Sequence, residues 1–479
     1  MKHKRRDFLK LTSLASAGFV GTSFLTGCSN PDSQAGKQDD IVKLASRERA
    51  QKFNMSGYGA EPIPTVRIGF VGLGNRGPGA VRRMSYLEGV EIKALCDIRP
   101  EKAEAAAKIL EGTTHQPELY TAGEDDWKNM CDRDDIDLIY IATPWSLHTP
   151  MAVYAMEQGK HAATEVPAAT TLEECWQLVE TSEKTRKHCV ILENCCYDFF
   201  ELLTLNMARQ GFFGEVMHGE GAYIHDILEG SFSKSKNYNN WRLRQNMHRN
   251  GNLYPTHGLG PVCQIMNINR GDRMDYLTST STSDFMMGKM ADSLAENDDY
   301  YKEFAGQDFR GNLNTSVVKT EHGKTIMIQH DTSSPRPYSR IHLISGTKGV
   351  ARKYPLPGKI ANSHKGWFSE EEMKAAEEKY TPEMVTLLGD MARKAGGHGG
   401  MDFLMDWRLI DCLRNGLPMD HDVYDAALWS SIFPLSEWST ANRSATIDVP
   451  DFTGGSWKRN NPVDISLKNG VSTKIAIPG

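Results

Sequence analysis

The sequence lacks the basic runs that accompany nucleic-acid binding. Outside its extreme N-terminus, residues of both charge signs are interspersed, and the formal net charge is −6. We therefore expect neither nucleic acid nor an anionic surface as a partner. Internal repeats and long low-complexity tracts are missing as well. The 42 glycines and nine tryptophans, in a chain of ordinary apolar content, favour a loop-rich soluble enzyme that acts on a small molecule or a glycan.

The sequence also lacks a cysteine framework, although it contains nine cysteines. Cys195-Cys196 does not have the CxxC spacing of a redox or metal pair, and no cluster of His and Cys recurs at ligand spacing. Most other cysteines stand singly in apolar or helical contexts, where small buried thiols are common. We therefore expect neither a disulfide scaffold nor a bound metal.

The apolar stretch Leu11–Leu25 is too short and too early in the chain for an ordinary transmembrane helix. It follows a basic segment, which is the charge order of a secretory signal. Arg5–Lys10 resembles a twin-arginine signal, and Leu25–Cys28 resembles a lipobox. We therefore predict a signal peptide over residues 1–28, with lipidation of Cys28. An ordinary cysteine near a soluble signal's cleavage site is the alternative.

Residues 29–60 are polar and predict a tether between the signal and the folded part of the chain. We expect an exported bacterial protein, periplasmic or anchored to the outer membrane, with the N-terminal lipid as its one membrane contact. The remaining length suits two domains. We place a nucleotide domain at residues 61–190 and a substrate domain at 191–479, and the sequence leaves the oligomeric state open.

A strand, a glycine-rich turn, a helix and a second strand follow one another from Val66 onward. Val66–Val71 is an apolar run of strand length, and apolar residues then recur at helical intervals up to Gly89. Val90–Cys96 predicts the second strand. This order is the one that a dinucleotide-binding domain requires around its glycines.

The turn between these elements has the GxGxxG spacing. Gly72 permits the tight turn, Gly74 lets the backbone approach a pyrophosphate, and Gly77 lets the helix pack closely, with its N-terminus toward the phosphates. Asp97, directly after the second strand, is placed to accept hydrogen bonds from the adenosine ribose. Its charge disfavours a 2′-phosphate, so we predict NAD rather than NADP. A glycine-rich turn in another α/β domain is the alternative.

Two further strand ends are expected at the same edge of the sheet. Ile136–Ala142 has the pattern of a buried strand, and Thr143–His148 leaves its carboxyl end, where open α/β sheets bind ligands. A helix over Pro150–Gln158 then leads to Glu165 at the next strand end. We regard Glu165 as a candidate for chemistry beside the cofactor. Its alternative role is a solvated cap on the helix that begins near Thr171.

The second half of the chain predicts a different kind of sheet. Strands are expected over Val216–Tyr223, Asp275–Ser283, Asn314–His330 and Tyr338–Ser345, with turns at His322-Gly323 and Gly346–Gly349. Trp407–Arg414 and Tyr424–Trp438 have an amphipathic pattern and are expected to return against the first domain. The expected fold class is therefore α/β, with an N-terminal Rossmann parallel sheet and a C-terminal α/β domain whose sheet is largely antiparallel.

From about Pro64 onward, the sequence resembles the glucose–fructose oxidoreductase and inositol dehydrogenase family. Dehydrogenases of that family carry a catalytic Lys in a Glu-Lys-Pro motif, and an Asp four residues before a catalytic His. The corresponding strings here are Glu165-Val166-Pro167 and Leu253-Tyr254-Pro255-Thr256-His257. The His remains, but Val166 replaces the Lys and Leu253 replaces the Asp. Because Val cannot carry a proton, we do not expect the usual sugar-dehydrogenase mechanism.

A narrower resemblance, to glycoside hydrolase family 109, accommodates both replacements. Seven strings carry it in order: Gly74–Gly77, Thr143–His148, Glu165–Ala168, Leu192–Asn194, Asn240–Arg242, Tyr254–Pro261 and Gly397–Asp402. The resemblance implies that NAD is lined by Asn75, Arg76, Asp97, Trp145, Ser146, Leu147, His148, Glu165, Val166 and Asn194. It implies that the sugar is lined by Tyr223, Arg242, Tyr254, Pro255, Thr256, His257 and Tyr338.

The family's best-known activity is removal of terminal α-linked N-acetylgalactosamine, with NAD but without net redox. The resemblance implies that tightly bound NAD⁺ takes a hydride from C3 of the sugar, which makes the proton on C2 acidic. A base removes that proton, the glycosidic oxygen leaves C1, water adds back, and NADH returns the hydride. The paired carboxylates of ordinary glycosidases are then unnecessary.

Proton carriers for this chemistry are available in the matching strings. His257 is expected to take the C3 hydroxyl proton, and Tyr254 to share that task or act at C2, with Glu165 as a third catalytic candidate. Arg242 is expected to hold the acetamido oxygen or polarise a developing enolate. A core histidine bonded to a backbone carbonyl is the alternative for His257.

Two other functions remain open from the sequence. A net NAD-dependent sugar oxidoreductase would exchange its cofactor with free NAD and accumulate NADH. A non-catalytic sugar-binding lipoprotein would do neither.

Overall fold

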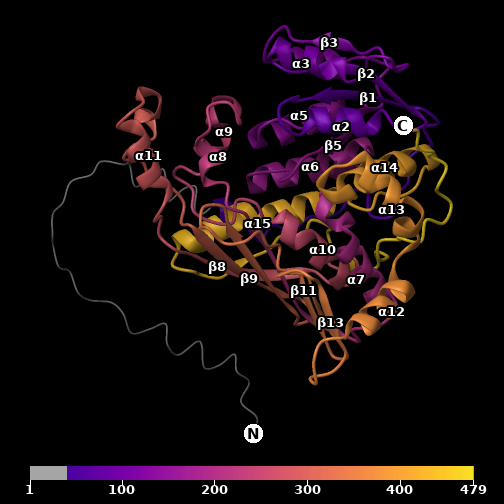
Figure 1. Cartoon of the computed structure of the whole chain (residues 1–479), viewed down its shortest axis with the longest axis vertical. Coiled ribbons are helices and arrows are strands. Elements are labelled where there is room, and N and C mark those ends of the chain that lie inside the picture. The colour runs from indigo at the N-terminus through magenta and orange to yellow at the C-terminus, as the bar shows by residue number, and fades with distance from the viewer. Residues whose placement is uncertain (1–39, 478–479) are drawn as a thin grey trace. The chain divides into compact units, whose positions relative to one another are not determined.

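The first part of the chain forms a six-stranded parallel sheet in the order β3-β2-β1-β4-β5-β6 (Figure 1). Its strands are β1 (Val66–Val71), β2 (Val90–Cys96), β3 (Glu118–Tyr120), β4 (Leu138–Ile141), β5 (His161–Thr164) and β6 (Cys189–Ile191). This is the Rossmann order, so the predicted nucleotide-binding sheet is confirmed. The structure, a computed structural model, describes residues 40–477.

Helices alternate with these strands, as right-handed parallel crossovers require. They are α2 (Gly77–Met84), α3 (Pro100–Lys108), α4 (Asp126–Cys131), α5 (His148–Glu157) and α6 (Leu172–Thr185). α6 begins where expected because the Thr171 hydroxyl accepts from the Glu174 N–H, and Glu174 reciprocates as a capping box. Thr171 thus caps its own helix, and Glu165 is not needed for that role.

The second sheet has eight strands in the order β13-β12-β11-β7-β10-β9-β8-β14. They are β7 (Val216–Ile224), β8 (Met274–Ser281), β9 (Leu313–Thr320), β10 (Thr325–Asp331), β11 (Leu343–Gly346), β12 (Val350–Arg352), β13 (Lys359–Ala361) and β14 (Ile447–Asp448). Every pairing is antiparallel except that of β7 with β10. The largely antiparallel sheet is confirmed. The parallel pairing of β7 with β10 was not predicted.

The strand expected over Tyr338–Ser345 is wrong in its first half. Ile341 and His342 have φ of 59° and 49°, so the backbone leaves the extended conformation there. β11 begins only at Leu343, and Ser339 keeps a single antiparallel bridge to Ile224.

Two long helices, α14 (Met401–Asn415) and α15 (Val423–Ala441), join the sheets. α15 packs against α6 of the first sheet and against β8 of the second, while α14 packs against α2 and β1 (Figure 1). Both helices contact elements of the first half of the chain, but their expected amphipathic character is wrong. Met401–Leu413 and Val423–Ser436 are buried on all sides, as a helix between two layers must be.

The other helices lie mostly with the second sheet. They are α7 (Phe199–Arg209), α8 (Leu228–Phe232), α9 (Trp241–Gln245), α10 (Thr256–Met266), α11 (Met287–Ala295), α12 (Glu370–Tyr380) and α13 (Glu383–Ala395). No helix among the described residues is both long and apolar enough to cross a membrane.

α10 lies directly on β7 because two glycines meet between them. A Cβ added at Gly221 would overlap the carbonyl oxygen of Gly258, and one added at Gly258 would overlap the backbone nitrogen of Ala222. Only a residue without a side chain fits at either place. This close approach brings His257, at the start of α10, beside Tyr223 on β7.

The segment from residue 41 to residue 60 does not form the free tether that was expected. The Leu44 carbonyl accepts from the Trp176 indole N–H, Arg49 forms an ion pair with Glu183, and Met55 is buried. A prediction from the polar composition of this stretch does not identify the few residues that anchor it. The predicted signal peptide and Cys28 lie outside the described residues.

A buried charged group links α14 to the first sheet. Arg83 on α2 donates to Asp406 on α14 at 2.7 Å, and the Tyr140 hydroxyl on β4 donates to the same carboxylate at 3.4 Å. Burial, opposed by the charge and hydrogen bond of Arg83 and assisted by the charge of Asp402, raises the pKa of Asp406 to about 6. Arg83 also faces Asp402, at 3.6 Å, so its charge is shared.

We expect Gly221→Ala to push α10 away from β7. Overpacking of this kind costs about 1–3 kcal/mol or more, and the shift of His257 should lower turnover beyond what the loss of stability explains. Gly389→Ala in α13, where an added Cβ makes only ordinary contacts of 3.4 Å and 3.6 Å, is the control. Unchanged thermal stability and activity in Gly221→Ala would contradict the close packing.

We expect the stability of the wild-type protein to fall as the pH rises from about 4 to about 6 through Asp406. In this window the carboxyl still binds a proton in the native state but has lost it in the unfolded state. Raising the pH across the window therefore lowers the free energy of unfolding, by roughly 2–3 kcal/mol. Asp406→Asn should lose this pH dependence, while Asp448→Asn at an exposed position keeps it. Denaturant unfolding at several pH values measures the difference, and parallel curves for wild type and Asp406→Asn would contradict it.

Candidate active site

A pocket of about 600 Å³ opens at the carboxyl ends of β1, β2, β4 and β5. This volume lies within the range of cofactor sites. Of the residues predicted to hold the dinucleotide or the sugar, the pocket brings together Gly72, Gly74, Asn75, Arg76, Asp97, Trp145, Ser146, Leu147, His148, Glu165, Val166, Arg242 and Tyr254. Residues from both halves of the chain therefore form one site.

The glycine-rich turn has the shape that a dinucleotide requires. Gly72 has a φ of 88°, and a Cβ there would stand 2.6 Å from the Ala142 backbone, so the turn and the neighbouring strand end are in direct contact. At Gly77 a Cβ would overlap the Gly72 carbonyl oxygen. An added Cβ at Gly74 would meet only the Arg99 side chain, at 3.5 Å. The backbone at Gly74 is thus open to a ligand, and the residues present fit NAD.

Hydrogen bonds from the protein hold the Asp97 carboxylate in place. Its carboxylate accepts from the Leu73 N–H at 2.8 Å and from the Arg99 N–H and Nε at 3.0 Å and 3.2 Å. Arg99 and Lys102 also line this end of the pocket, and the sequence argument for NAD over NADP left these cations out. That preference stays a prediction.

Arg76 connects three parts of the site. Its Nε donates to Glu165 at 2.9 Å, and its Nη1 donates to Asp402 at the N-terminus of α14 at 3.2 Å. Burial would lower the pKa of Arg76, but the two carboxylates raise it well above its usual value. Glu165, predicted as a catalytic candidate, is therefore the partner of a permanent cation.

Two residues predicted to line NAD use their polar atoms on the protein. The Asn194 side-chain amide donates to Asp402 at 2.5 Å, outside the pocket. His148 has Nδ1 2.7 Å from the Pro167 carbonyl and Nε2 2.8 Å from the Thr143 carbonyl. Burial lowers the pKa of His148, against those two acceptors. The Asn194 side chain is thus bonded to α14 and the His148 ring to the backbone of two loops, and direct contact of either with NAD stays a prediction.

The inner end of the pocket is aromatic. The Arg242 guanidinium carbon lies 5.1 Å from the ring centre of Trp145, 5.3 Å from that of Trp241 and 5.4 Å from that of Tyr254. Each distance is within the range of cation–π attraction. The cation is held in place by ring faces, so its N–H groups remain available to an oxygen of a ligand.

Tyr254 lines the pocket and contacts two residues that lie outside its lining. Its ring centre is 4.9 Å from that of His257 and 4.8 Å from that of Tyr223, and the last two rings are 5.4 Å apart. Burial raises the pKa of Tyr254 well above its usual value and that of Tyr223 less strongly, against the charge of Arg242. Both phenols are therefore protonated at neutral pH.

The other residues predicted to line the sugar differ from one another in burial and in their contacts. Thr256 is fully buried, and Pro255 caps the start of α10. Tyr338 is 40% exposed, and its hydroxyl accepts from Arg340 at 3.1 Å. It reaches the cluster through His225, whose ring centre is 5.0 Å away. Sugar contacts of all three stay predictions.

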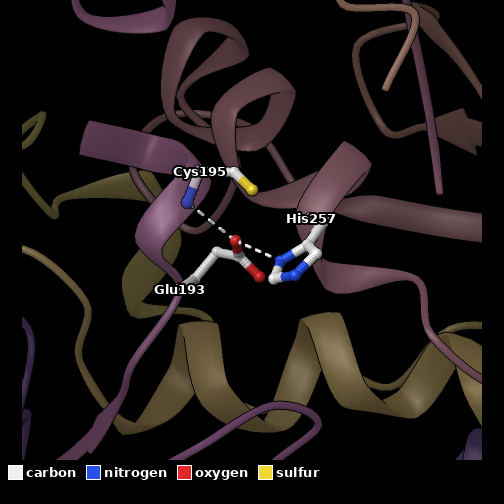
Figure 2. A group of neighbouring side chains, drawn as sticks. All are labelled: Glu193, Cys195 and His257. Atoms are coloured by element: carbon white, nitrogen blue, oxygen red, sulfur yellow. Dashed lines mark hydrogen bonds and ion pairs between the residues drawn. The ribbon is translucent and has the colours of Figure 1, made fainter. Parts of the chain in front are cut away.

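Glu193, which was not predicted as a functional residue, lies beside His257 (Figure 2). Its Oε1 is 2.7 Å from His257 Nδ1 and accepts from the Cys195 N–H at 3.0 Å. The Glu193 side chain is fully buried, and that of His257 is 14% exposed. A carboxylate bond thus replaces the backbone bond that was the alternative for His257.

The ligand atoms of Glu193, Cys195 and His257 lie within 4.8 Å of one another, as a metal site would require. Two ligands of one tetrahedral zinc ion stand about 3.3 Å apart, whereas the Glu193 and His257 atoms are 2.7 Å apart. Burial also raises the pKa of the Cys195 thiol well above its usual value. This geometry fits a shared proton better than a metal ion.

The other omission is the segment Ser235, Lys236, Asn237, Tyr238 and Asn239, which we call the clasp. It lines the pocket from the second half of the chain. No motif or periodic pattern marks the clasp in the sequence. Glu193 did have a signal, because it follows a strand end in the same way as Glu165.

Two family models match the chain. The model described as "Glycosyl hydrolase 109, C-terminal domain" matches residues 197–459, and "Oxidoreductase family, NAD-binding Rossmann fold" matches residues 66–193. A Bacteroides fragilis protein named alpha-N-acetylgalactosaminidase is 52% identical over 84% of this chain and 95% of its own length. A glycosyl hydrolase family 109 protein of Porphyromonas gingivalis is 50% identical over 83% of this chain and 86% of its own.

Solved structures agree on the fold alone. Levoglucosan dehydrogenase in complex with NADH and levoglucosan has a TM-score of 0.61 at 17% identity, over 81% of this chain and 100% of that one. An NAD-binding oxidoreductase from Klebsiella pneumoniae has a TM-score of 0.58 at 18% identity, with the same coverage. With both domain models in order and relatives of this identity, the chain is a glycoside hydrolase that belongs to family 109 and carries an NAD-binding Rossmann domain.

Proposed function

We propose that the enzyme removes terminal α-linked N-acetylgalactosamine by transient oxidation of the sugar at C3, with NAD retained and recycled. The observation that carries this proposal is the ring cluster of Tyr254, His257 and Tyr223, which continues directly from the dinucleotide pocket. The choice of sugar is supported by the Bacteroides fragilis relative named alpha-N-acetylgalactosaminidase.

The ordinary glycosidase mechanism has less support in this site. It uses two carboxyl groups that face each other across the scissile bond, one protonated and one ionised. Glu165 forms an ion pair with Arg76, and Glu193 is hydrogen-bonded to His257. Neither is placed as half of such a pair.

Bound NAD would supply reversible hydride transfer at C3, so that a 3-ketone makes the C2 proton acidic and the glycosidic oxygen leaves C1. The residues of the chain then have to move protons. His257 takes the C3 hydroxyl proton during oxidation and returns it at the end. Tyr254, protonated by its buried setting, donates to the sugar, and Arg242 offers its N–H groups to the acetamido or developing enolate oxygen.

We expect the purified protein to release the aglycone from a chromogenic α-N-acetylgalactosaminide without added NAD and without accumulation of NADH. His257→Ala should lower turnover by about 10²- to 10⁴-fold and leave the bound NAD in place, because His257 lies outside the pocket wall. Aglycone formation and NADH absorbance are followed together.

Stoichiometric NADH that depends on free NAD⁺ would instead identify a net oxidoreductase. No release across a panel of N-acetylhexosaminides would contradict the proposed glycosidase. Loss of NAD from His257→Ala would contradict the separation of the base from the cofactor pocket.

Retention of the cofactor is supported by the clasp. The Asn75 side-chain amide donates to the Lys236 carbonyl at 2.6 Å, which joins the glycine-rich turn to the clasp. The Arg99 guanidinium carbon lies 5.0 Å from the ring centre of Tyr238. A dinucleotide in the pocket is thus covered by a segment of the other domain, and its release requires these contacts to open.

We expect Tyr238→Ala to release NAD faster, because the ring that Arg99 contacts is lost. An exposed cation–π contact is worth about 0.5–1 kcal/mol, which corresponds to a two- to fivefold faster release. Tyr238→Phe keeps the ring and is the matched control. NAD content after dialysis, and dependence of activity on added NAD⁺, are the measurements. Equal retention by Tyr238→Ala and Tyr238→Phe would show that the clasp does not hold the cofactor.

Export of the folded enzyme with its cofactor is part of this proposal. The twin-arginine-like and lipobox-like strings of residues 1–28 support it, although they lie outside the described residues. Twin-arginine systems carry folded proteins, so NAD can be bound before export. A recycled cofactor suits a compartment in which free NAD is scarce.

A further inference from the structure

Glu193 lies outside the dinucleotide pocket and has no part in the chemistry given above. It follows β6 of the first sheet, whereas His257 begins α10 on the second sheet (Figure 2). Within the described residues, the Glu193 Oε2 atom is buried and makes no hydrogen bond. Both hydrogen bonds of this carboxylate are therefore made by Oε1. One is with the Cys195 backbone N–H, and the other is with His257 Nδ1.

We propose that Glu193 is the positioning residue of the active site, which holds His257 in the tautomer protonated on Nδ1 and so leaves Nε2 as the proton acceptor. This inference rests on the proposed function. In this role, a buried carboxylate of the cofactor domain fixes the tautomer of the histidine that accepts a proton from the sugar.

The direction of the hydrogen bond follows from the charge of Glu193. Burial alone would raise the pKa of this carboxyl, but the contact with His257 and the Cys195 N–H together lower it. An ionised carboxylate only accepts, so Nδ1 has to donate. Nε2 then carries the lone pair, and it makes no hydrogen bond to any described residue.

The proposed proton transfer balances at both ends. Bound NAD would supply the acceptor for the hydride from C3, and in that oxidation Nε2 of His257 takes the proton of the C3 hydroxyl. The resulting imidazolium faces the Glu193 carboxylate, which stabilises its charge. When C3 is reduced again, Nε2 returns the proton to the C3 oxygen.

Among residues 40–477, no other carboxylate contacts His257. The residues that immediately precede His257, from Asn250 to Thr256, contain no acid. The titratable groups that face His257 from neighbouring elements are Tyr223, Tyr254, Cys195, His225 and Glu193 itself. Among these, Glu193 alone is an acid with a lowered pKa.

The test compares three variants by steady-state kinetics, pH profile and isotope effect. Glu193→Ala should lower kcat by about 10²- to 10⁴-fold with little change in KM or in bound NAD. Glu193→Gln keeps an acceptor for Nδ1–H but loses the charge, so an intermediate loss is expected. In Glu193→Gln the acidic limb of the kcat profile should also move to lower pH, and the effect of deuterium at C3 should grow. Glu183→Gln, an equally buried carboxylate paired with Arg49, should change stability but none of these readouts.

The ring tautomer is measured separately by ¹⁵N NMR of histidine-labelled protein, with His257→Gln to assign the signal. We expect a protonated Nδ1 and an unprotonated Nε2 in the wild type, and loss of this preference in Glu193→Ala. A wild-type ring protonated on Nε2, or Glu193 variants that match Glu183→Gln in every kinetic readout, would overturn the proposal. Because the NMR result does not require turnover, it decides the role of Glu193 even if the enzyme proves inactive on α-N-acetylgalactosaminides.

Discussion

The direct contact between α10 and β7 sets the position of the groups that the proposed chemistry uses. Gly221 and Gly258 let the helix lie on the strand without a side chain between them. The same contact fixes His257 against Tyr223 and Tyr254 on one side and against Glu193 on the other. His257 is therefore held by elements of both sheets at once, and neither sheet alone forms the site.

A second constraint is the fixed charge beneath the cofactor pocket. Arg76 and Arg83 meet Asp402 and Asp406 on the first turns of α14, and Glu165 completes the set. Buried ion pairs such as these contribute little net stability but penalise any arrangement that separates the partners. These ion pairs fix the position of the glycine-rich turn relative to α14, so the pocket and the ring cluster stay aligned.

The sequence predicts the first sheet well because its signals are local. β1 and β2 have the predicted bounds, and Gly72, Gly74, Asp97 and Glu165 all line the pocket as expected. The errors arise where long-range packing decides. The kink at Ile341 and His342, the burial of α14 and α15 on all sides, and the anchoring of residues 41–60 depend on partners distant in sequence.

The same distinction applies to the site. Motif strings identify His257, Tyr254 and Arg242, but a motif does not show which atoms those residues are bonded to. Glu193 and the clasp are 64 and about 160 positions away from their partners His257 and Asn75. Only the fold brings them together.

The proposed chemistry requires that the sugar is oxidised and restored within one turnover on a resident cofactor. A substrate that carries deuterium at both C2 and C3 tests it in a single mass measurement on the released sugar. We expect the deuterium at C3 to be retained, because the hydride returns to the carbon it left, and the deuterium at C2 to be replaced by solvent hydrogen. Release of a sugar that keeps both labels would contradict the account, since ordinary hydrolysis touches neither carbon.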